Sequence, residues 1–270
     1  MNFIDICTKT FESGGQIDII YTDFEKAFDK VPHKRLLSKL KSYGVQSDII
    51  KWVEIFLCYR KHQVRINGRY SHWMDVLSGI PQGSVLGPLL FVIYINDLPE
   101  VCDRLCNLFL FADDAKLFKH INNDNDSAVL QECCHKLYSW SENWLMKLNI
   151  DKCKILTIAR PRSAIEHTYG FNVNNVDFVE LEKVTNMKDL GVIIDNELSF
   201  KEHIHEKVNK AFQMIGIINR SFQDIDKNYF LLIYKSTVKS HLEYANSVWN
   251  PYKSHLIDQI EVSKREQPSW

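Results

Sequence analysis

The segment that decides the fold is NLFLFADDAKLF, residues 107–118. Two short apolar runs flank the adjacent carboxylates Asp113 and Asp114, and this pattern predicts two strands joined by a tight hairpin. Two like charges at a hairpin tip repel each other unless a cation offsets them. Because side chains alternate between the two faces of a strand, one carboxylate should be the stronger metal ligand, and we assign that role to Asp113.

A third carboxylate ends another apolar run. The segment IDIIYTD, residues 17–23, follows Gly14 and Gly15 and predicts a buried strand that ends on Asp23. If this strand lies beside the Asp113 strand, the two carboxylates can hold a pair of Mg²⁺ ions roughly 3.5–4 Å apart. Taken separately, each motif is more often a polar turn or a plain strand end than a metal site.

The remaining patterns alternate between helices and strands. Expected helices lie at residues 33–43, after Ser47, after the Gly- and Pro-containing loop 78–84 (as a buried helix), at 127–148, and beyond Phe200. Further expected strands lie at 63–68, with a hairpin turn at Asn67-Gly68, at 155–158, and as short segments within 171–195. This order favours an α+β fold with an antiparallel sheet and does not fit a doubly wound sheet. A change in composition near Asn196 predicts two domains, residues 1–196 and 197–270.

The formal net charge of −1 conceals a basic segment. From Lys26 to His72 the chain has 11 Lys and Arg residues but only 3 Asp and Glu residues. Such a segment beside an acidic remainder is typical of a face that meets phosphate, although most charge runs are solvated helix faces. Phosphate contacts position nucleic acid without reading its sequence. The candidates are Lys30, Lys34, Arg35, Arg60, Lys61 and Arg65.

The cysteines and the apolar runs bear on the compartment. The chain has seven cysteines, no N-terminal signal pattern and no apolar run of membrane-spanning length. We therefore expect a soluble, intracellular protein with free thiols, in the nucleus or the cytoplasm. Some Cys and His spacings could suggest zinc but match no familiar zinc pattern, so a zinc site is not expected. These residues are Cys102, Cys106, Cys133, Cys134 and His135.

Together, the motifs resemble the reverse transcriptases of LINE-like (non-LTR) retrotransposons, and jockey-like elements are the nearest type. DFEKAFDKVPH (23–33) resembles motif A of that family, SGIPQGSVLGP (78–88) resembles motif B, and FADD (111–114) resembles motif C. LNIDKCK (148–154) is similar to motif D, and LGVIID (190–195) resembles the motif E region. The motifs stand in the family's order, and the resemblance covers residues 18–251.

The resemblance implies a polymerase palm, an antiparallel sheet backed by helices, followed by a helical thumb-like region. It implies an RNA-directed DNA polymerase that transfers a nucleotide from a deoxynucleoside triphosphate to a primer 3′-hydroxyl on an RNA template. Asp23 and Asp113 would bind two Mg²⁺ ions, for which Mn²⁺ could substitute, and Asp114 would support them. The backbone carbonyl of Phe24 would complete one metal site. A DNA primer and an RNA template are the implied partners.

Further residues would contact the nucleotide. Phe28 would pack beneath the sugar and exclude a 2′-hydroxyl; it also fits core packing, and its bulk disfavours a palm-type RNA-dependent RNA polymerase. Gln82 and Gly83 would contact the incoming nucleotide and the template base opposite it. Lys152 would protonate or neutralise pyrophosphate. Lys154 would share the face of Lys152 on a strand and is the alternative to it.

The chain departs from the family pattern at both ends. About 20 residues precede Asp23, where the family has a fingers region that grips the triphosphate, and no endonuclease domain precedes the polymerase. At the other end, QPSW (267–270) departs from the family pattern that begins at Ile260. We therefore expect a domain truncated at both ends with its fingers largely missing. The alternative function is a catalytically inactive remnant that acts at most as a nucleic-acid-binding module.

Overall fold

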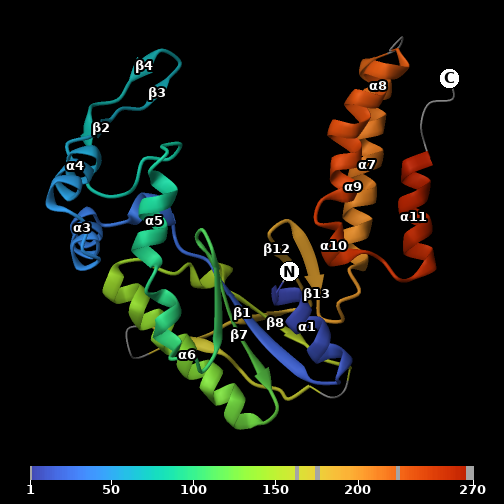
Figure 1. The fold of residues 1–270 in the computed structure, drawn as a ribbon, viewed down its shortest axis with the longest axis horizontal. Helices are drawn as coiled ribbons and strands as arrows, with labels where there is room; N and C mark the ends of the chain where they lie inside the picture. Colours follow the sequence, from blue (N-terminus) through green and yellow to red (C-terminus); the bar gives the residue numbers. More distant parts are fainter. Residues whose placement is uncertain (1, 162–163, 174–176, 223–225, 266–270) are drawn as a thin grey trace. The chain divides into compact units, whose positions relative to one another are not determined.

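The computed structural model describes residues 2–161, 164–173, 177–222 and 226–265, shown as a ribbon in Figure 1. These residues form two compact units. The larger unit comprises Ile17–Ile155 and Ile165–Lys183, and the smaller unit comprises Met1–Gln16, Leu156–Ala164 and Val184–Trp270. All the polymerase-like motifs except the motif E region therefore lie in the larger unit.

Most of a five-stranded sheet with the strand order β11-β8-β1-β7-β6 belongs to the larger unit. In chain order these strands are β1 (Gln16–Thr22), β6 (Asn107–Phe111), β7 (Asp114–Ile121), β8 (Lys154–Ile158) and β11 (Glu182–Val184). Every residue of the central strand β1 is buried, which explains its nearly continuous apolar run. Its one carboxylate, Asp18, accepts a hydrogen bond from the Tyr169 hydroxyl at 2.7 Å. The predicted strand before Asp23 is confirmed.

The carboxylate hairpin is also confirmed. Strands β6 and β7 pair antiparallel, with Phe111 opposite Asp114, so that Ala112 and Asp113 form a two-residue turn. Ala112 takes a φ of 51°, the left-handed conformation that short hairpin turns require. Asp114 is thus the first residue of β7, and Asp113 occupies the tip.

The larger unit also contains helices. They are α2 (Ala27–Lys30), α3 (His33–Ser42), α4 (Ser47–Leu57), α5 (Gly87–Ile95) and α6 (Asp124–Trp144), with short 3₁₀ turns at Leu98–Cys102 and Ile150–Lys152. Helix α6 contacts strand β7 of the sheet, whereas α3 contacts α4 and α5. The core lies between sheet and helices and takes residues from both, including Ile20, Leu36, Phe91, Leu117 and Leu137. The observed sheet and helices confirm the α+β class.

Three helix predictions need correction. Helix α6 begins before Ser127, because the Asn123 side chain accepts the Asp126 N–H at 3.1 Å and caps the helix there. It ends before residue 148, because Leu145 is left-handed. Helix α4 contains Ser47 instead of being capped by it. Helix α5 is only partly buried, because Leu89 and Val92 are 56% and 51% exposed.

Two smaller pairs of strands extend from the helices of the larger unit. Strand β2 (Lys61–His62) pairs with β5 (Met74–Asp75), and β3 (Arg65–Ile66) pairs with β4 (Arg69–Tyr70). The second pair confirms the hairpin that turns at Asn67-Gly68. A third pair joins β9 (Gly170–Val173) and β10 (Asp177–Glu180).

The smaller unit is mainly helical. It contains α1 (Asn2–Glu12), the hairpin β12 (Asn186–Asp189) and β13 (Val192–Asp195), α7 (Lys201–Ser221), α8 (Lys227–Tyr234), a π-helical turn at Lys235–Lys239, α9 (Ser240–Glu243), α10 (Asn246–Trp249) and α11 (Ser254–Arg265). The helical tail is confirmed. Helix α1 was not predicted, although Phe3, Cys7 and Thr10 recur at helical spacing and are buried. Among the described residues, no helix is both long and apolar enough to cross a membrane.

Candidate active site

The three candidate catalytic carboxylates lie at neighbouring strand ends. Asp23 directly follows β1, and the Thr22 hydroxyl donates to the Ala115 carbonyl at 3.1 Å, so the end of β1 lies beside the start of β7. Asp114 begins β7, and Asp113 precedes it in the turn. The strands are neighbours, as the two-metal hypothesis requires. The Asp23 side chain is 33% exposed, so solvent can reach it.

The carboxylate oxygens suit Mg²⁺ in kind. In residues 2–161, 164–173, 177–222 and 226–265, however, no group of three or more His, Cys, Asp or Glu side chains is placed so that it could hold a metal ion. Mg²⁺ is usually bound by one or two carboxylates, waters and substrate phosphates, and not by an all-protein cage. A pair of aspartates on adjacent strand ends fits that mode of binding.

A cation lies against Asp23. The segment after α6 pairs with the residues around Asp23: the Asn149 N–H donates to the Asp23 carbonyl at 2.8 Å, and Phe24 forms an antiparallel bridge with Leu148. This pairing brings Lys152 Nζ to 3.4 Å from Asp23 Oδ2. Lys154 Nζ instead contacts Glu182 Oε2 at 2.6 Å. The two lysines therefore contact different carboxylates.

Phe28 belongs to both the core and the exposed site region. Its ring stacks on that of Phe91, with centroids 4.4 Å apart and an interplanar angle of 19°. The side chain is only half-buried, so part of the ring remains open. Core packing and contact with a ligand are thus compatible for this residue.

The loop of motif B is fixed to motif A by hydrogen bonds. The Ile80 N–H donates to the Phe28 carbonyl at 2.8 Å, and the Gly79 N–H donates to the Val31 carbonyl at 2.9 Å. The Gln82 amide nitrogen donates to Asp29 Oδ1 at 3.0 Å. Gln82, a candidate nucleotide contact, is therefore bonded to motif A, in an exposed position.

The two glycines of this loop have different surroundings. Both have positive φ, 88° at Gly79 and 77° at Gly83. A Cβ at Gly79 would lie 2.5 Å from the Asp29 carbonyl oxygen, whereas a Cβ at Gly83 would meet nothing within 4 Å. The missing side chain of Gly79 thus makes room for the protein's own backbone, and the space at Gly83 is open.

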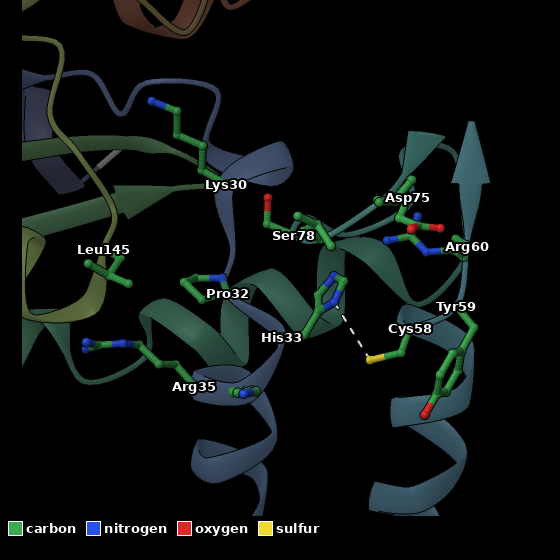
Figure 2. A pocket seen from close by; sticks show the side chains of 13 residues that line it. Lys30, Pro32, His33, Arg35, Cys58, Tyr59, Arg60, Asp75, Ser78 and Leu145 are labelled. Carbon is green, nitrogen blue, oxygen red and sulfur yellow. Dashed lines mark hydrogen bonds between the residues drawn. The ribbon is translucent and has the colours of Figure 1, made fainter. Parts of the chain in front are cut away.

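Beside this loop is a pocket of about 810 Å³ with a basic lining. Four of the six candidate phosphate-binding residues line it, namely Lys30, Lys34, Arg35 and Arg60, and Figure 2 shows three of them labelled. Lys30 forms an ion pair with Glu25, which lowers the pKa of that carboxyl. The other two candidates, Lys61 and Arg65, lie on the strands β2 and β3.

His33 and Arg60 organise the wall of this pocket. His33 Nε2 donates to the Gly79 carbonyl at 2.8 Å, since a carbonyl can only accept, and His33 Nδ1 lies 3.8 Å from Cys58 Sγ (Figure 2). Arg60 donates to the same carbonyl at 2.8 Å and to the Leu57 carbonyl at 2.8 Å. Burial lowers the pKa of Arg60. Sequence reasoning gave His33 no role.

The comparison with protein families identifies the chain. The family described as reverse transcriptase (RNA-dependent DNA polymerase) matches residues 3–194. The chain belongs to the reverse transcriptase family. The resemblance seen in the motifs is thereby confirmed, and this is an enzyme family.

The curated relatives of this reverse transcriptase chain are non-LTR retrotransposon proteins. It is 31% identical to the probable RNA-directed DNA polymerase from transposon BS of Drosophila melanogaster, over 76% of the chain and 23% of the relative. It is 30% identical to the RNA-directed DNA polymerase from mobile element jockey of the same species, over 87% of the chain and 26% of the relative. The chain spans about a quarter of the length of these relatives. It is a reverse transcriptase domain of the non-LTR type.

A solved structure has a fold similar to that of this reverse transcriptase domain. The structure of telomerase from Candida albicans, in complex with a fragment of telomeric RNA, matches with a TM-score of 0.51 at 12% identity. The match covers 97% of this chain and 51% of that one. At this identity the likeness shows the fold alone, a palm and thumb arrangement.

Proposed function

We propose that this domain is an RNA-directed DNA polymerase that transfers a nucleotide from a deoxynucleoside triphosphate to a primer 3′-hydroxyl. Asp23 and Asp113 are its principal metal ligands, and Asp114 and the Phe24 carbonyl support them. The observation that carries the proposal is that the end of β1 lies beside the start of β7, which places the three aspartates at neighbouring strand ends. Lys152 adds to it, because its cation lies 3.4 Å from Asp23.

Members of the reverse transcriptase family generally use divalent metal ions. Two such ions, when bound, lower the pKa of the primer hydroxyl and offset charge on the leaving pyrophosphate. Within the chain, Asp23 and Asp113 supply hard oxygen ligands from rigid strand ends. Lys152 is the proton donor, or the neutralising cation, for the pyrophosphate.

Residues in and around the motif B loop select the incoming nucleotide. Phe28, on α2, offers a partly open ring that excludes a ribose 2′-hydroxyl. Gln82 contacts the base pair after exchanging its bond with Asp29, and the open space at Gly83 allows a base or sugar to approach the backbone. The basic pocket binds phosphates of the RNA template or the DNA primer. Residues 1–196 then act as the palm and 197–270 as a thumb-like region.

Single-nucleotide primer extension on an RNA template, with Mg²⁺ or Mn²⁺, tests the proposal. We expect extension by the unaltered chain and at least about a 10²-fold loss in Asp113→Asn, because the variant lacks a charged metal ligand. Asp177→Asn, in the exposed strand β10, is the matched control and should extend normally. If a chain shown to be folded extends no primer, the polymerase proposal is contradicted. The result would then support the alternative, an inactive remnant that at most binds nucleic acid.

A further inference from the structure

An exposed arm runs from Arg60 to Val76 in the larger unit. It consists of the pairs β2–β5 and β3–β4, and every residue of these four strands is exposed. The Val76 N–H donates to the Arg60 carbonyl at 2.9 Å and closes the base of the arm. In Figure 1 the arm extends beyond α4, with β3 and β4 at its tip. The arm has no core of its own, so burial does not explain its side chains.

The composition of the arm is basic and aromatic. Residues 60–74 contain four Lys or Arg residues and two His residues, and no Asp or Glu. The acidic residue of the arm, Asp75, lies at its base and pairs with Lys61 at 3.7 Å. Two large rings stand among these cations: Tyr70 is 60% exposed and Trp73 is 64% exposed. Proteins that bind single-stranded nucleic acid combine exposed aromatic side chains with cations in this way.

The arm places a cation and a ring together. Arg65 and Tyr70 are register partners in the β3–β4 pair, so their side chains share a face. The guanidinium carbon of Arg65 lies 5.3 Å from the centre of the Tyr70 ring. Because the guanidinium lies over one face of the ring, a base would stack on the other face, with this cation within reach of the adjacent phosphate.

Hydrogen bonds hold the arm in shape and fix its base. The Ser71 N–H donates to the Val64 carbonyl at 2.9 Å, and the Gln63 amide donates to the Ser71 carbonyl at 2.7 Å. At the base, Arg60 is bonded to the Gly79 carbonyl of the motif B loop. A surface ordered in advance loses less conformational entropy when it binds. The anchor also links the arm to the proposed nucleotide site.

We propose that this arm grips single-stranded nucleic acid, with bases stacked on Tyr70 and Trp73 and phosphates held by Arg65 and Arg69. Duplex bases are already stacked on each other, so exposed rings favour a single strand. A surface with no acidic residue over fifteen positions suits a polyanion. The inference rests on the proposed function for the identity of the strand, the template ahead of the site, but the binding itself needs no catalytic carboxylate.

Fluorescence anisotropy with a fluorescein-labelled oligouridylate tests the arm in the full chain. Stacking predicts that Tyr70→Ala and Trp73→Ala each weaken binding roughly fivefold or more. Tyr70→Phe keeps the ring and should bind like the unaltered chain, which separates stacking from a general disturbance of the hairpin. Tyr229→Ala is the matched control, because Tyr229 is a similarly exposed ring, at 67%, on α8.

Further probes identify the ligand. Arg69→Gln should lower the slope of log affinity against log salt concentration by about 0.7, the value for one phosphate contact on a single strand. Oligodeoxythymidylate compares DNA with RNA, and weaker binding of it by the same two alanine variants also supports the proposal. Blunt RNA duplex should bind more weakly and should not respond to Trp73→Ala. Unchanged oligonucleotide affinity in both alanine variants, or no affinity in the unaltered chain, would overturn the proposal and point to a protein ligand.

The two proposals fail in different ways. Asp113→Asn should lower primer extension at least about 10²-fold and leave oligouridylate binding intact, because the carboxylate is not part of the arm. Failure of the polymerase proposal therefore shows as binding without extension. If the arm proposal is wrong, Tyr70→Ala and Trp73→Ala will change neither primer extension nor oligouridylate binding.

Discussion

Lys152 Nζ lies 3.4 Å from Asp23 Oδ2, whereas Lys154, two residues later, contacts Glu182. Lys152 ends the 3₁₀ turn Ile150–Lys152, whereas Lys154 begins β8, so the two lysines do not share the face that a continuous strand would have given them. Lys152 is 67% exposed and can turn toward a ligand while remaining near the carboxylate. This geometry favours Lys152 as the group that acts on pyrophosphate.

Exchange of each lysine for alanine tests this assignment. We expect Lys152→Ala to slow single-turnover nucleotide addition about 10²-fold, the lower range for loss of a general acid, with little change in nucleotide affinity. Lys154→Ala, the matched control, should change the rate less than about threefold. Equal effects of the two substitutions would contradict the assignment.

The two motif B glycines predict a difference in stability. Gly79→Ala puts a methyl group 2.5 Å from the Asp29 carbonyl oxygen in a left-handed residue, so we expect a loss of about 2–4 kcal/mol in the free energy of unfolding. Gly83→Ala carries only the backbone strain, about 1 kcal/mol. Urea unfolding measures both. In primer extension, Gly83→Ala should impair nucleotide binding, since its methyl group enters the open space.

Phe28 predicts two separable effects. Phe28→Ala should raise the kcat/KM for ribonucleotides relative to deoxynucleotides about tenfold or more, because the ring no longer excludes the 2′-hydroxyl. It should also lower the free energy of unfolding by about 2–3 kcal/mol, because the stack on Phe91 is lost. Phe28→Tyr keeps the ring and should retain selectivity. Unchanged sugar selectivity in a folded Phe28→Ala protein would contradict a role in sugar selection and would show that Phe28 serves only in core packing.

His203 predicts a pH dependence of stability in the smaller unit. The ring is fully buried, and its Nδ1 accepts the Ile193 N–H at 3.1 Å, which requires an unprotonated Nδ1. Burial, with a smaller effect from Lys207, lowers its pKa to about 4. Between this value and the unfolded value near 6.5, the unfolded chain binds more protons than the folded one. The contribution of His203 to the free energy of unfolding is therefore fully present above pH 6.5 and is lost as the pH falls toward 4.

Denaturant titrations from pH 7 to pH 4 measure this effect. We expect this histidine to account for a loss of up to about 3 kcal/mol over that range. His203→Gln keeps a hydrogen-bond acceptor but does not titrate in this range, so its stability should fall less steeply with acid. Parallel pH profiles of the two proteins would contradict the role of His203.

The strands and helices that hold the motifs follow from local sequence. The apolar run before Asp23 and the paired runs around Asp113 and Asp114 give strands, because their side-chain pattern fits a buried sheet. Asn67-Gly68 gives a hairpin through its left-handed backbone. The boundaries of α6 were less predictable, because they depend on one cap at Asn123 and one left-handed residue at Leu145.

Local sequence is sufficient to predict the family, the candidate carboxylates and the strands that present them, since motif residues and side-chain periodicity are local properties of the chain. The folded chain is needed to show which strand ends meet, which lysine reaches Asp23, and that the backbone of Asp29 fills the space over Gly79. These relations join residues that lie far apart in the sequence. They depend on strand order and backbone packing, which no local pattern encodes.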